Sequence, residues 1–593
     1  MTPNRGVDAG TTIGSNAAQH HLSPAVLWSQ MNVNDLELRV RTVEGLPILQ
    51  HFFDRMSLDH FLVTYVPGKK LGREPKLPHG RALLVMVANV LLSREPLYAV
   101  REWLDSHASE FLGLEPEDGE LFNDDRIGRA LDRLYETDPA SLLTALVTRV
   151  VREFDLDLGQ IHNDSTTVTF SGGYEGQEDP EQKERPPLIT FGHNKDHRPD
   201  LKQLVYSLTV NADGAVPVHY KTYDGNTTDD QTHIDTWETV CRIAGNTGFL
   251  YVADSKLCTR GNMDHIHDHG GRFLTVLPRS RKEDDDFREQ VQTSRVPWEE
   301  VRRRKGRNKD DPDEVYEAYE PPARTLEGYR IIWYRSSVKL RLDAKRRGQR
   351  IDRAKQRIER LEERTGAHRF RSVESAQKAS DNVLSEVGAG RWLRVQARSV
   401  DASEYRQISP GRPGKDTKYR KAERNVIVFE IEEIAEAILG DARCDGLFAM
   451  TTNDEQMTPG ELLQAYKYQP FLEKRNEQLK SVLAVAPVFL QRPERVAALL
   501  FLYYMAVMTF ALIEREIRRA MAGEGIESLP LYPEGRQARS PTADLVLRAF
   551  DSIRRSELLG KDGAPLKIFH DPLKDVAIET LRLLGVPAQA YGE

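Results

Sequence analysis

The chain has few cysteines and no apolar segment near its first residue. Its three cysteines, Cys241, Cys258 and Cys444, are far apart among 593 residues and form no Cys-x-x-Cys pair. This spacing argues against a disulfide framework and against a cysteine zinc site. Residues 1–24 are polar, so we expect a disordered tail rather than a secretion signal, and a cytoplasmic protein.

The chain also lacks an excess of positive charge. It has 83 Lys and Arg residues against 91 Asp and Glu residues, a formal net charge of −8, which argues weakly against nucleic-acid binding. In a chain of several domains the distribution of charge matters more than the sum. Basic residues cluster at 302–307, 339–360 and 415–424. Each cluster is either a solvated surface or a contact for the DNA backbone.

A single long stretch, 496–513, contains no charged residue. Its length is marginal for a membrane span. It contains Tyr503, Tyr504 and Thr509, and Glu514 follows at once. We therefore expect a buried core helix and no contact with a membrane.

The pattern of apolar residues predicts an α/β protein. Residues 25–150 show helical periodicity and no strand-like alternation, whereas 161–170 and 203–210 alternate as strands do. A turn at 211–214 leads to a return strand at 215–223. Helix, strand, helix and strand then follow at 233–243, 249–253, 262–269 and 272–277. This order predicts a mixed sheet with helices.

Charged segments that contain proline and glycine then interrupt this domain. Within them we expect strands at 329–334, 392–397 and 425–430 and a long helix at 338–365. In this helix Ile351, Ala354, Ile358 and Leu361 have a coiled-coil-like spacing. The predicted organisation is a tail (1–24), an all-helical N-terminal DNA-binding domain (25–150), a first core part (151–280), an insertion domain (281–440), a second core part (441–520) and a helical C-terminal region (521–593).

The segment from Tyr466 to Lys480 has a spacing that points to a charged ligand. Tyr466, Glu473 and Lys480 are seven residues apart, so on one helix they would share a face. Pro470 lies between the first two, and it either bends the helix or begins a new one. In both cases Glu473 and Lys480 are expected to keep their helical relation.

Two acidic residues far upstream complete a candidate metal site. Asp254 follows the apolar strand 249–253, where ligands gather in α/β sheets, and Asp164 lies within a strand rich in threonine. The alternatives for these residues are a turn or helix cap, a solvent-facing Asp, and a solvated Glu473. Together, Asp164, Asp254 and Glu473 could hold two Mg²⁺ or Mn²⁺ ions against a phosphodiester.

The order Asp164, Asp254, Glu473 resembles the DDE triad of bacterial insertion-sequence transposases with an RNase H-like core. The glutamate segment is similar to the Tyr-Arg-Glu-Lys signature of the "IS-four" superfamily, with Tyr466, Gln469, Glu473 and Lys480 at its four positions. The segments that begin at His162 (HNDSTTVTFSG), Gly192 (GHNKDHRPDLKQL), Tyr223 (YDGNTTD) and Val252 (VADSKL) also look like this group's core.

The resemblance implies a cut-and-paste transposase that cleaves and joins double-stranded DNA at terminal inverted repeats and inserts it into target DNA. It implies a homodimer in the synaptic complex and an active-site position for the polar loop at 195–200. Gln469 departs from the family's Arg and lacks its charge. The expected DNA contacts are Tyr466, Lys467, Gln469, Arg475 and Lys480.

Two other functions are compatible with the same residues. One is an RNase H-like nuclease that cuts DNA without joining it, and the other is an inactive DNA-binding protein derived from a transposase. Strand transfer of pre-cleaved ends separates the first from a transposase. Carboxylates that lie far apart in the fold would favour the second.

Overall fold

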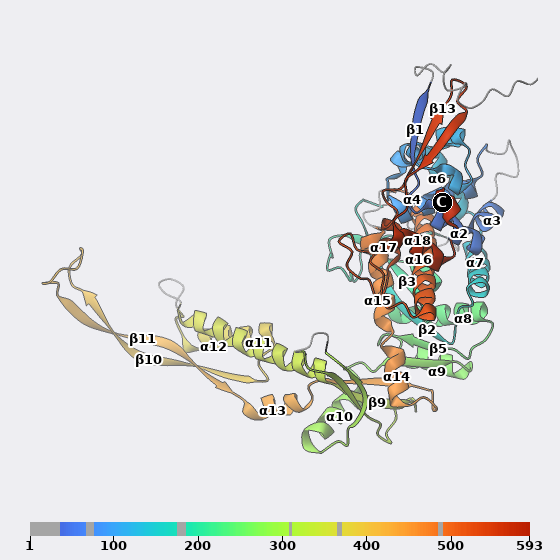
Figure 1. Cartoon of the computed structure of the whole chain (residues 1–593). Helices are drawn as coiled ribbons and strands as arrows, with labels where there is room; N and C mark the ends of the chain where they lie inside the picture. The colour runs from blue at the N-terminus through green and yellow to red at the C-terminus, as the bar shows by residue number, and fades with distance from the viewer. Residues whose placement is uncertain are drawn as a thin grey trace, which may run out of the picture. The chain divides into compact units, whose positions relative to one another are not determined.

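The computed structural model describes residues 36–66, 76–174, 185–306, 311–363, 370–483 and 490–592 (Figure 1). The predicted tail 1–24 lies outside these residues. The chain forms two compact units. Unit 1 comprises Met1–Asp54, Leu84–Ile127 and Glu516–Glu593, and unit 2 comprises Arg55–Leu83 and Gly128–Arg515.

Unit 1 contains a three-stranded antiparallel sheet in the order β1-β13-β14. The strands are β1 (Glu37–Thr42), β13 (Arg554–Leu559) and β14 (Pro565–His570). This sheet corrects the prediction of an all-helical N-terminal domain and a helical C-terminal region. The pattern of β1 is weak because its apolar residues, Leu38 and Val40, are exposed, and its partner lies at the other end of the chain.

The helices of unit 1 are mostly short. They are α5 (Val100–Ser106), α17 (Ala543–Arg548), α18 (Asp575–Leu584) and the 3-10 turns η2 (Leu97–Ala99), η3 (Ser109–Leu112), η4 (Pro116–Leu121) and η8 (Ala588–Tyr591). Four helices contain a boundary between the units along the chain: α2 (Leu46–Met56), α4 (His79–Leu92), α6 (Asp124–Tyr135) and α16 (Pro493–Glu524).

Unit 2 is built on a nine-stranded mixed sheet. Only the pairs β2/β5 and β5/β6 are parallel, and the others are antiparallel. In order across the sheet, the strands are β4 (Pro217–Tyr223), β3 (Lys202–Asn211), β2 (Gln160–Phe170), β5 (Leu250–Ala253), β6 (Arg272–Val276), β12 (Leu447–Thr452), β9 (Arg330–Ser336), β8 (Glu314–Tyr319) and β7 (Glu299–Arg304).

Local sequence pattern accounts for the central strands. The predictions at 161–170, 203–210, 215–223, 249–253 and 272–277 are confirmed as β2, β3, β4, β5 and β6. All four residues of β5 are buried, which agrees with its unbroken apolar sequence. The antiparallel strands β7, β8, β9 and β12 then widen the same sheet.

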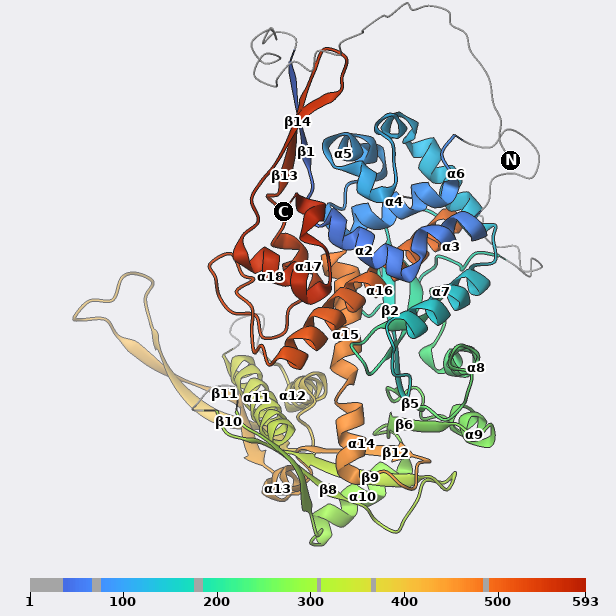
Figure 2. The same cartoon turned by 45° about the vertical axis from the view of Figure 1, so that its right-hand side comes forward.

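Helix α8 leads from β4 to β5, and α9 connects the parallel strands β5 and β6, in the order that the sequence predicted (Figure 2). The helices that lie wholly within unit 2 are α3 (Leu58–Tyr65), α7 (Pro139–Glu153), α8 (His233–Ala244), α9 (Arg260–Asp268), α10 (Lys282–Thr293), α11 (Ser337–Glu362), α12 (Val373–Val387), α13 (Ala435–Arg443), α14 (Pro459–Tyr466), α15 (Gln469–Glu477), the π-helical segment η7 (Gln478–Val482) and the 3-10 turn η5 (Asp229–Gln231).

A small hydrophobic core joins α11 and α12 to the hairpin β10 (Leu393–Gln407) and β11 (Tyr419–Glu433). From α11 it takes Ile351, Ala354, Ile358 and Leu361, the residues with the predicted coiled-coil-like spacing. Their partners are α12 and the base of the hairpin rather than a second long helix. The two hairpin strands pair over fifteen residues each, longer than the sequence predicted.

Helix α16 contains the uncharged stretch 496–513. In the described part of the chain, α16 is long and apolar enough to cross a membrane. The same holds for the bent pair His79–Leu92 and Leu97–Ser106 if the two helices are counted as one span. However, 89% of the apolar window of α16 is buried inside the protein, as in a core helix. Tyr504 and Phe501 stack on Tyr220 of β4, with ring centroids 4.7 and 5.6 Å apart.

A buried ion pair fixes α15 against α16 within unit 2. Arg475 Nη1 lies 2.8 Å from Glu514 Oε2, and both side chains are only 4% exposed. Arg475 also donates hydrogen bonds to the carbonyl oxygens of Gly214 and Ala215, in the turn between β3 and β4. Arg475 therefore joins α15, α16 and the sheet.

We expect Arg475→Met to lower the free energy of unfolding by about 3–5 kcal/mol, because it leaves the Glu514 carboxylate buried without its cation. The double variant Arg475→Met/Glu514→Leu should recover most of that loss. Urea denaturation of the full chain, evaluated at the transition of unit 2, measures the free energies of unfolding of both variants. A double variant as unstable as the single one would contradict this interpretation of the pair.

Candidate active site

Two of the predicted carboxylates lie on neighbouring strands of the sheet, Asp164 within β2 and Asp254 directly after β5. Strands β2 and β5 are parallel, and their register ends with Asn163 opposite Ala253. The next residue in each strand direction is an aspartate, so this register places Asp164 and Asp254 next to each other. Both side chains are partly exposed. The structure therefore brings together two residues that are 90 positions apart in sequence.

Helix α15 is fixed to β2 by polar contacts that begin at Gln469. Its amide oxygen lies 2.9 Å from Nδ1 of His162, and its amide nitrogen donates to the carbonyl oxygen of Asn163. Seven residues after Gln469, in the last turn of α15, Asn476 donates a hydrogen bond to Asp164 Oδ2 at 3.3 Å. Gln469, Glu473 and Asn476 are four and three residues apart, so Glu473 lies on the helix face between the two contacts. Its own side chain is exposed.

Tyr466 lies within electrostatic reach of all three predicted carboxylates. Burial raises the pKa of its phenol to about 12, because the phenolate form would be desolvated. The negative charges of Asp254, Glu473 and Asp164, in that order, add to this rise. Even so, the described residues contain no group of three or more His, Cys, Asp or Glu side chains arranged to hold a metal ion.

The segment from Tyr466 to Lys480 is not one straight helix. Tyr466 ends α14, Pro470 lies in the first turn of α15, and Lys480 lies in the π-helical segment η7. Of the two alternatives at Pro470, a bend or a new helix, the structure has the new helix, so Tyr466 lies on a different helix from Glu473. Proline has no N–H to donate and clashes with the preceding turn, so a new helix begins there.

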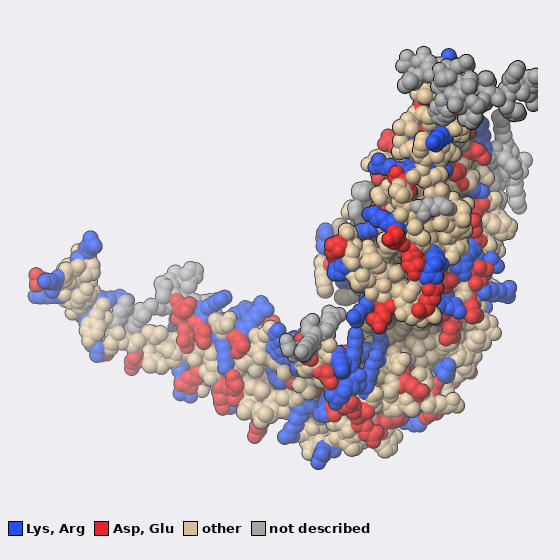
Figure 3. Space-filling view, viewed as in Figure 1, with Lys and Arg blue, Asp and Glu red and all other residues tan. Residues whose placement is uncertain are grey.

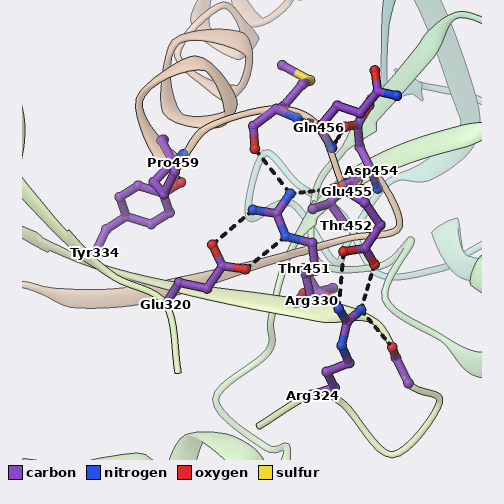
Figure 4. A network of polar contacts seen from close by, with 12 residues as sticks. Glu320, Arg324, Arg330, Tyr334, Thr451, Thr452, Asp454, Glu455, Gln456 and Pro459 are labelled. Carbon is purple, nitrogen blue, oxygen red and sulfur yellow. Dashed lines mark hydrogen bonds and ion pairs between the residues drawn. The ribbon is translucent and has the colours of Figure 1, made fainter. Parts of the chain in front are cut away.

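Arg330 fixes the connection between β12 and α14 (Figure 4). Its guanidinium pairs with both oxygens of Glu320, at 2.8 and 2.9 Å. It also donates to the carbonyl oxygens of Asp454 and Met457, just before α14. Tyr334 donates to the carbonyl oxygen of Pro459 at 2.8 Å. These contacts hold the start of α14, and hence Tyr466, against the sheet.

The polar loop at 195–200 reaches the candidate site, as the sequence resemblance implied. Lys195 Nζ donates to the carbonyl and hydroxyl oxygens of Ser165 and lies 3.8 Å from Asp164 Oδ1. The neighbouring Asp196 accepts from Lys480 with both carboxylate oxygens, at 2.7 and 2.9 Å. Lys195 and Lys480 are thus both bound by groups of the candidate site itself.

Three of the predicted DNA contacts are engaged inside the protein. Gln469 and Arg475 are 6% and 3% exposed and bind His162 and Glu514. Lys467 Nζ lies 2.6 Å from the Tyr316 hydroxyl, over that ring. Gln469 and Arg475 therefore position α15 in this structure and are almost entirely buried. The difference arises because helical spacing gives no indication of which face a tertiary contact covers.

Sequence reasoning missed Asn476, and it placed Asp196 in a loop near the site without finding its partner. Asn476 follows Glu473 by three residues on the same helix face, so helical spacing from Glu473 could have indicated it. The pairing of Asp196 with Lys480 joins residues 284 positions apart and has no local signal.

Comparison with known proteins gives limited information. Residues 38–148 match a family model described as a domain of unknown function, DUF4277. No curated protein matches the chain. Among solved structures, the cryo-EM structure of the piggyBac transposase synaptic complex with hairpin DNA matches at 9% identity and a TM-score of 0.26, over 50% of this chain and 62% of that chain. The match thus spans less than two thirds of that chain, and at this TM-score the folds cannot be equated.

His162 makes the stability of this region depend on pH. Burial lowers the pKa of its imidazole to about 4, and the hydrogen bond that the ring donates to Gln469 only partly opposes this shift. Nδ1 donates to Gln469 and Nε2 accepts from Gln160, so the neutral ring satisfies both nitrogens. Between pH 4 and 6.5 the unfolded chain binds a proton there and the folded chain does not.

We therefore expect the free energy of unfolding to fall as the pH is lowered from about 6.5 to about 4, by up to about 3 kcal/mol for this histidine. His162→Gln should remove its share of that dependence, although it costs some stability at pH 7. Urea denaturation at pH 7, 5.5 and 4.5 measures the slope. The exposed His197→Gln serves as the control, and equal slopes for wild type and His162→Gln would disprove the assignment.

Proposed function

We propose that this protein is a DNA transposase of the DDE type, with an RNase H-like core that carries Asp164, Asp254 and Glu473. It would cleave DNA at the terminal inverted repeats of an insertion sequence and join the ends to target DNA, as a dimer that holds two ends. The observation that carries the proposal is that Asp164 and Asp254 lie side by side at β2 and β5, and that α15, the helix that bears Glu473, is bonded to Asp164 through Asn476.

The proposed metal chemistry agrees with the type of ligand atoms present. Carboxylate oxygens are the ligands that Mg²⁺ and Mn²⁺ prefer. Two such ions would stabilise the attacking and leaving oxygens at a phosphodiester. Because the described residues form no ready ligand cluster, ion binding requires the exposed Glu473 side chain to turn towards the two aspartates. Asn476 and Lys195 hold Asp164 in place for that arrangement.

Basic surface outside the candidate site supports a DNA partner. Six cations of the outer half of the hairpin β10–β11 are exposed: Arg406, Arg412, Lys415, Lys418, Arg420 and Lys421. Figure 3 shows mostly Lys and Arg atoms, with some Asp or Glu atoms beside them, at this end of the hairpin, and both signs of charge elsewhere on the same face. At its base, Arg394 and Arg398 pair with Glu432 and Glu430. The positive charge is therefore local, which reconciles DNA binding with a net charge of −8.

Glu473→Gln should abolish Mg²⁺-dependent cleavage of DNA that carries the element's ends, a loss of at least a thousandfold, because it removes one of three ligand carboxylates. Binding of the same DNA, measured by mobility shift without metal, should change less than twofold. Glu477→Gln, on the same helix, is the matched control.

Undiminished cleavage by Glu473→Gln would disprove the proposal. Cleavage by the wild type without joining of pre-cleaved ends would assign a nuclease instead of a transposase. Binding without any cleavage by the wild type would assign an inactive DNA-binding protein.

Asp196→Asn should raise the affinity for DNA ends two- to tenfold, because Lys480 loses its carboxylate partner and becomes available to a phosphate. The slope of the logarithm of the binding constant against the logarithm of the salt concentration should become more negative by about 0.9. The change should vanish in the double variant Asp196→Asn/Lys480→Gln. Fluorescence anisotropy at four salt concentrations tests this, and a gain that persists without Lys480 would contradict it.

A further inference from the structure

The loop 194–200, just before β3, has its backbone fixed beside the candidate active site. Asn194 is 7% exposed, and its amide oxygen accepts from the N–H groups of Asp196 and Arg198, at 2.7 and 3.3 Å. The N–H of Lys195 donates to the hydroxyl of Thr167 in β2 at 3.3 Å. These bonds hold two neighbouring residues of opposite charge, Lys195 and Asp196, in one turn.

Each of these two residues binds a site residue of the opposite charge. The Lys195 ammonium donates to the carbonyl and hydroxyl oxygens of Ser165, at 2.7 and 2.8 Å, and lies 3.8 Å from Asp164 Oδ1. Asp196 accepts from Lys480 with both carboxylate oxygens, at 2.7 and 2.9 Å. The loop therefore brings a positive charge to a predicted metal ligand and a negative charge to a predicted DNA contact.

Both ion pairs lie where a ligand can replace them. The side chains of Lys195 and Asp164 are 34% and 23% exposed, and those of Asp196 and Lys480 are 42% and 25% exposed. Ion pairs at such positions are weak, because water screens them. A divalent cation carries twice the charge of an ammonium and binds carboxylate oxygens directly. A DNA phosphate offers a lysine the same kind of charged oxygen as a carboxylate.

We propose that the loop 194–200 is an autoinhibitory loop, whose charges stand in for the metal ion and the DNA phosphate. Lys195 holds Asp164 in place until an ion takes over that carboxylate. Asp196 holds Lys480 until a phosphate takes over that ammonium. The inference rests on the proposed function, which supplies both ligands, and adds the regulation of the same site.

The shape of the loop couples the two exchanges. Because the side chain of Asn194 and the hydroxyl of Thr167 fix Lys195 and Asp196 in one turn, release of either ion pair loosens the other. Metal binding should therefore favour DNA binding, since it breaks contacts that DNA must otherwise break. By linkage, DNA should tighten metal binding by the same factor.

Binding of Mn²⁺ to the full chain without DNA, measured by electron paramagnetic resonance of the free ion, tests the inference. Asp196→Asn should tighten Mn²⁺ binding about two- to tenfold, because the loop loses the anchor that keeps Lys195 at Asp164. The sign decides, since loss of a negative charge near a cation site would by itself weaken binding. Asp200→Asn is the matched control, because Asp200 pairs with the exposed Arg198, and it should not tighten binding.

Two further measurements separate this role from a purely structural one. Lys195→Gln should tighten Mn²⁺ binding at least twofold, because a competing cation is removed, whereas a lysine that only orients Asp164 for the metal would give weaker binding. In the wild type, saturating Mn²⁺ should speed hydrogen exchange of the Lys195 and Asp196 N–H groups at least fivefold. Asp164→Asn should abolish both effects, which locates the ion at the site.

The outcomes distinguish this inference from the proposed function. If the wild type binds Mn²⁺ but Asp196→Asn weakens that binding or leaves it unchanged, the autoinhibitory loop is overturned and the proposed function stands. Weaker binding by Lys195→Gln, or exchange that stays slow at saturating Mn²⁺, has the same meaning. If neither the wild type nor Asp196→Asn binds Mn²⁺ at millimolar concentration, the proposed function and this inference both fail.

Discussion

The hydrogen bond between His162 and Gln469 is the contact on which the candidate site depends. It joins β2 to the first turn of α15 across 307 positions of sequence. Together with the hydrogen bond from Asn476 to Asp164, it holds α15, which bears Glu473, against the strand that bears Asp164. The buried pair of Arg475 and Glu514 acts on the other side of the same helix. Helix α15 is thus held from two sides by buried polar contacts, which depend strongly on exact geometry.

This arrangement gives a physical reason for Gln469 where the resembling family has an arginine. An uncharged amide can accept from a neutral histidine and donate to a carbonyl oxygen in a dry interface. A guanidinium in that place would bring an unpaired charge next to a ring that burial keeps neutral. The departure from the family pattern therefore agrees with a structural role for this position.

Prediction from sequence worked where a segment determines its own structure. The strands around Asp164 and Asp254 have clear alternation or an unbroken apolar run, and the spacing of α11 indicated the residues that it buries. Prediction from sequence failed where contacts between distant segments determine the local structure. Strand β1 exists through its pairing with β13, and the π-helical turn at Lys480 and the Lys480–Asp196 contact come from tertiary packing. The residues of the proposed triad were found by spacing and resemblance, whereas their supporting contacts were not.

The central claim is that Asp164, Asp254 and Glu473 together hold divalent ions. Anomalous scattering from crystals of the full chain soaked in Mn²⁺ tests it most directly. The account predicts two peaks about 3.5–4 Å apart, bounded by the three carboxylates, with Glu473 turned towards the aspartates. Well-diffracting crystals with no peak at these residues, or with Mn²⁺ bound by the aspartates while Glu473 remains in solvent, would contradict it.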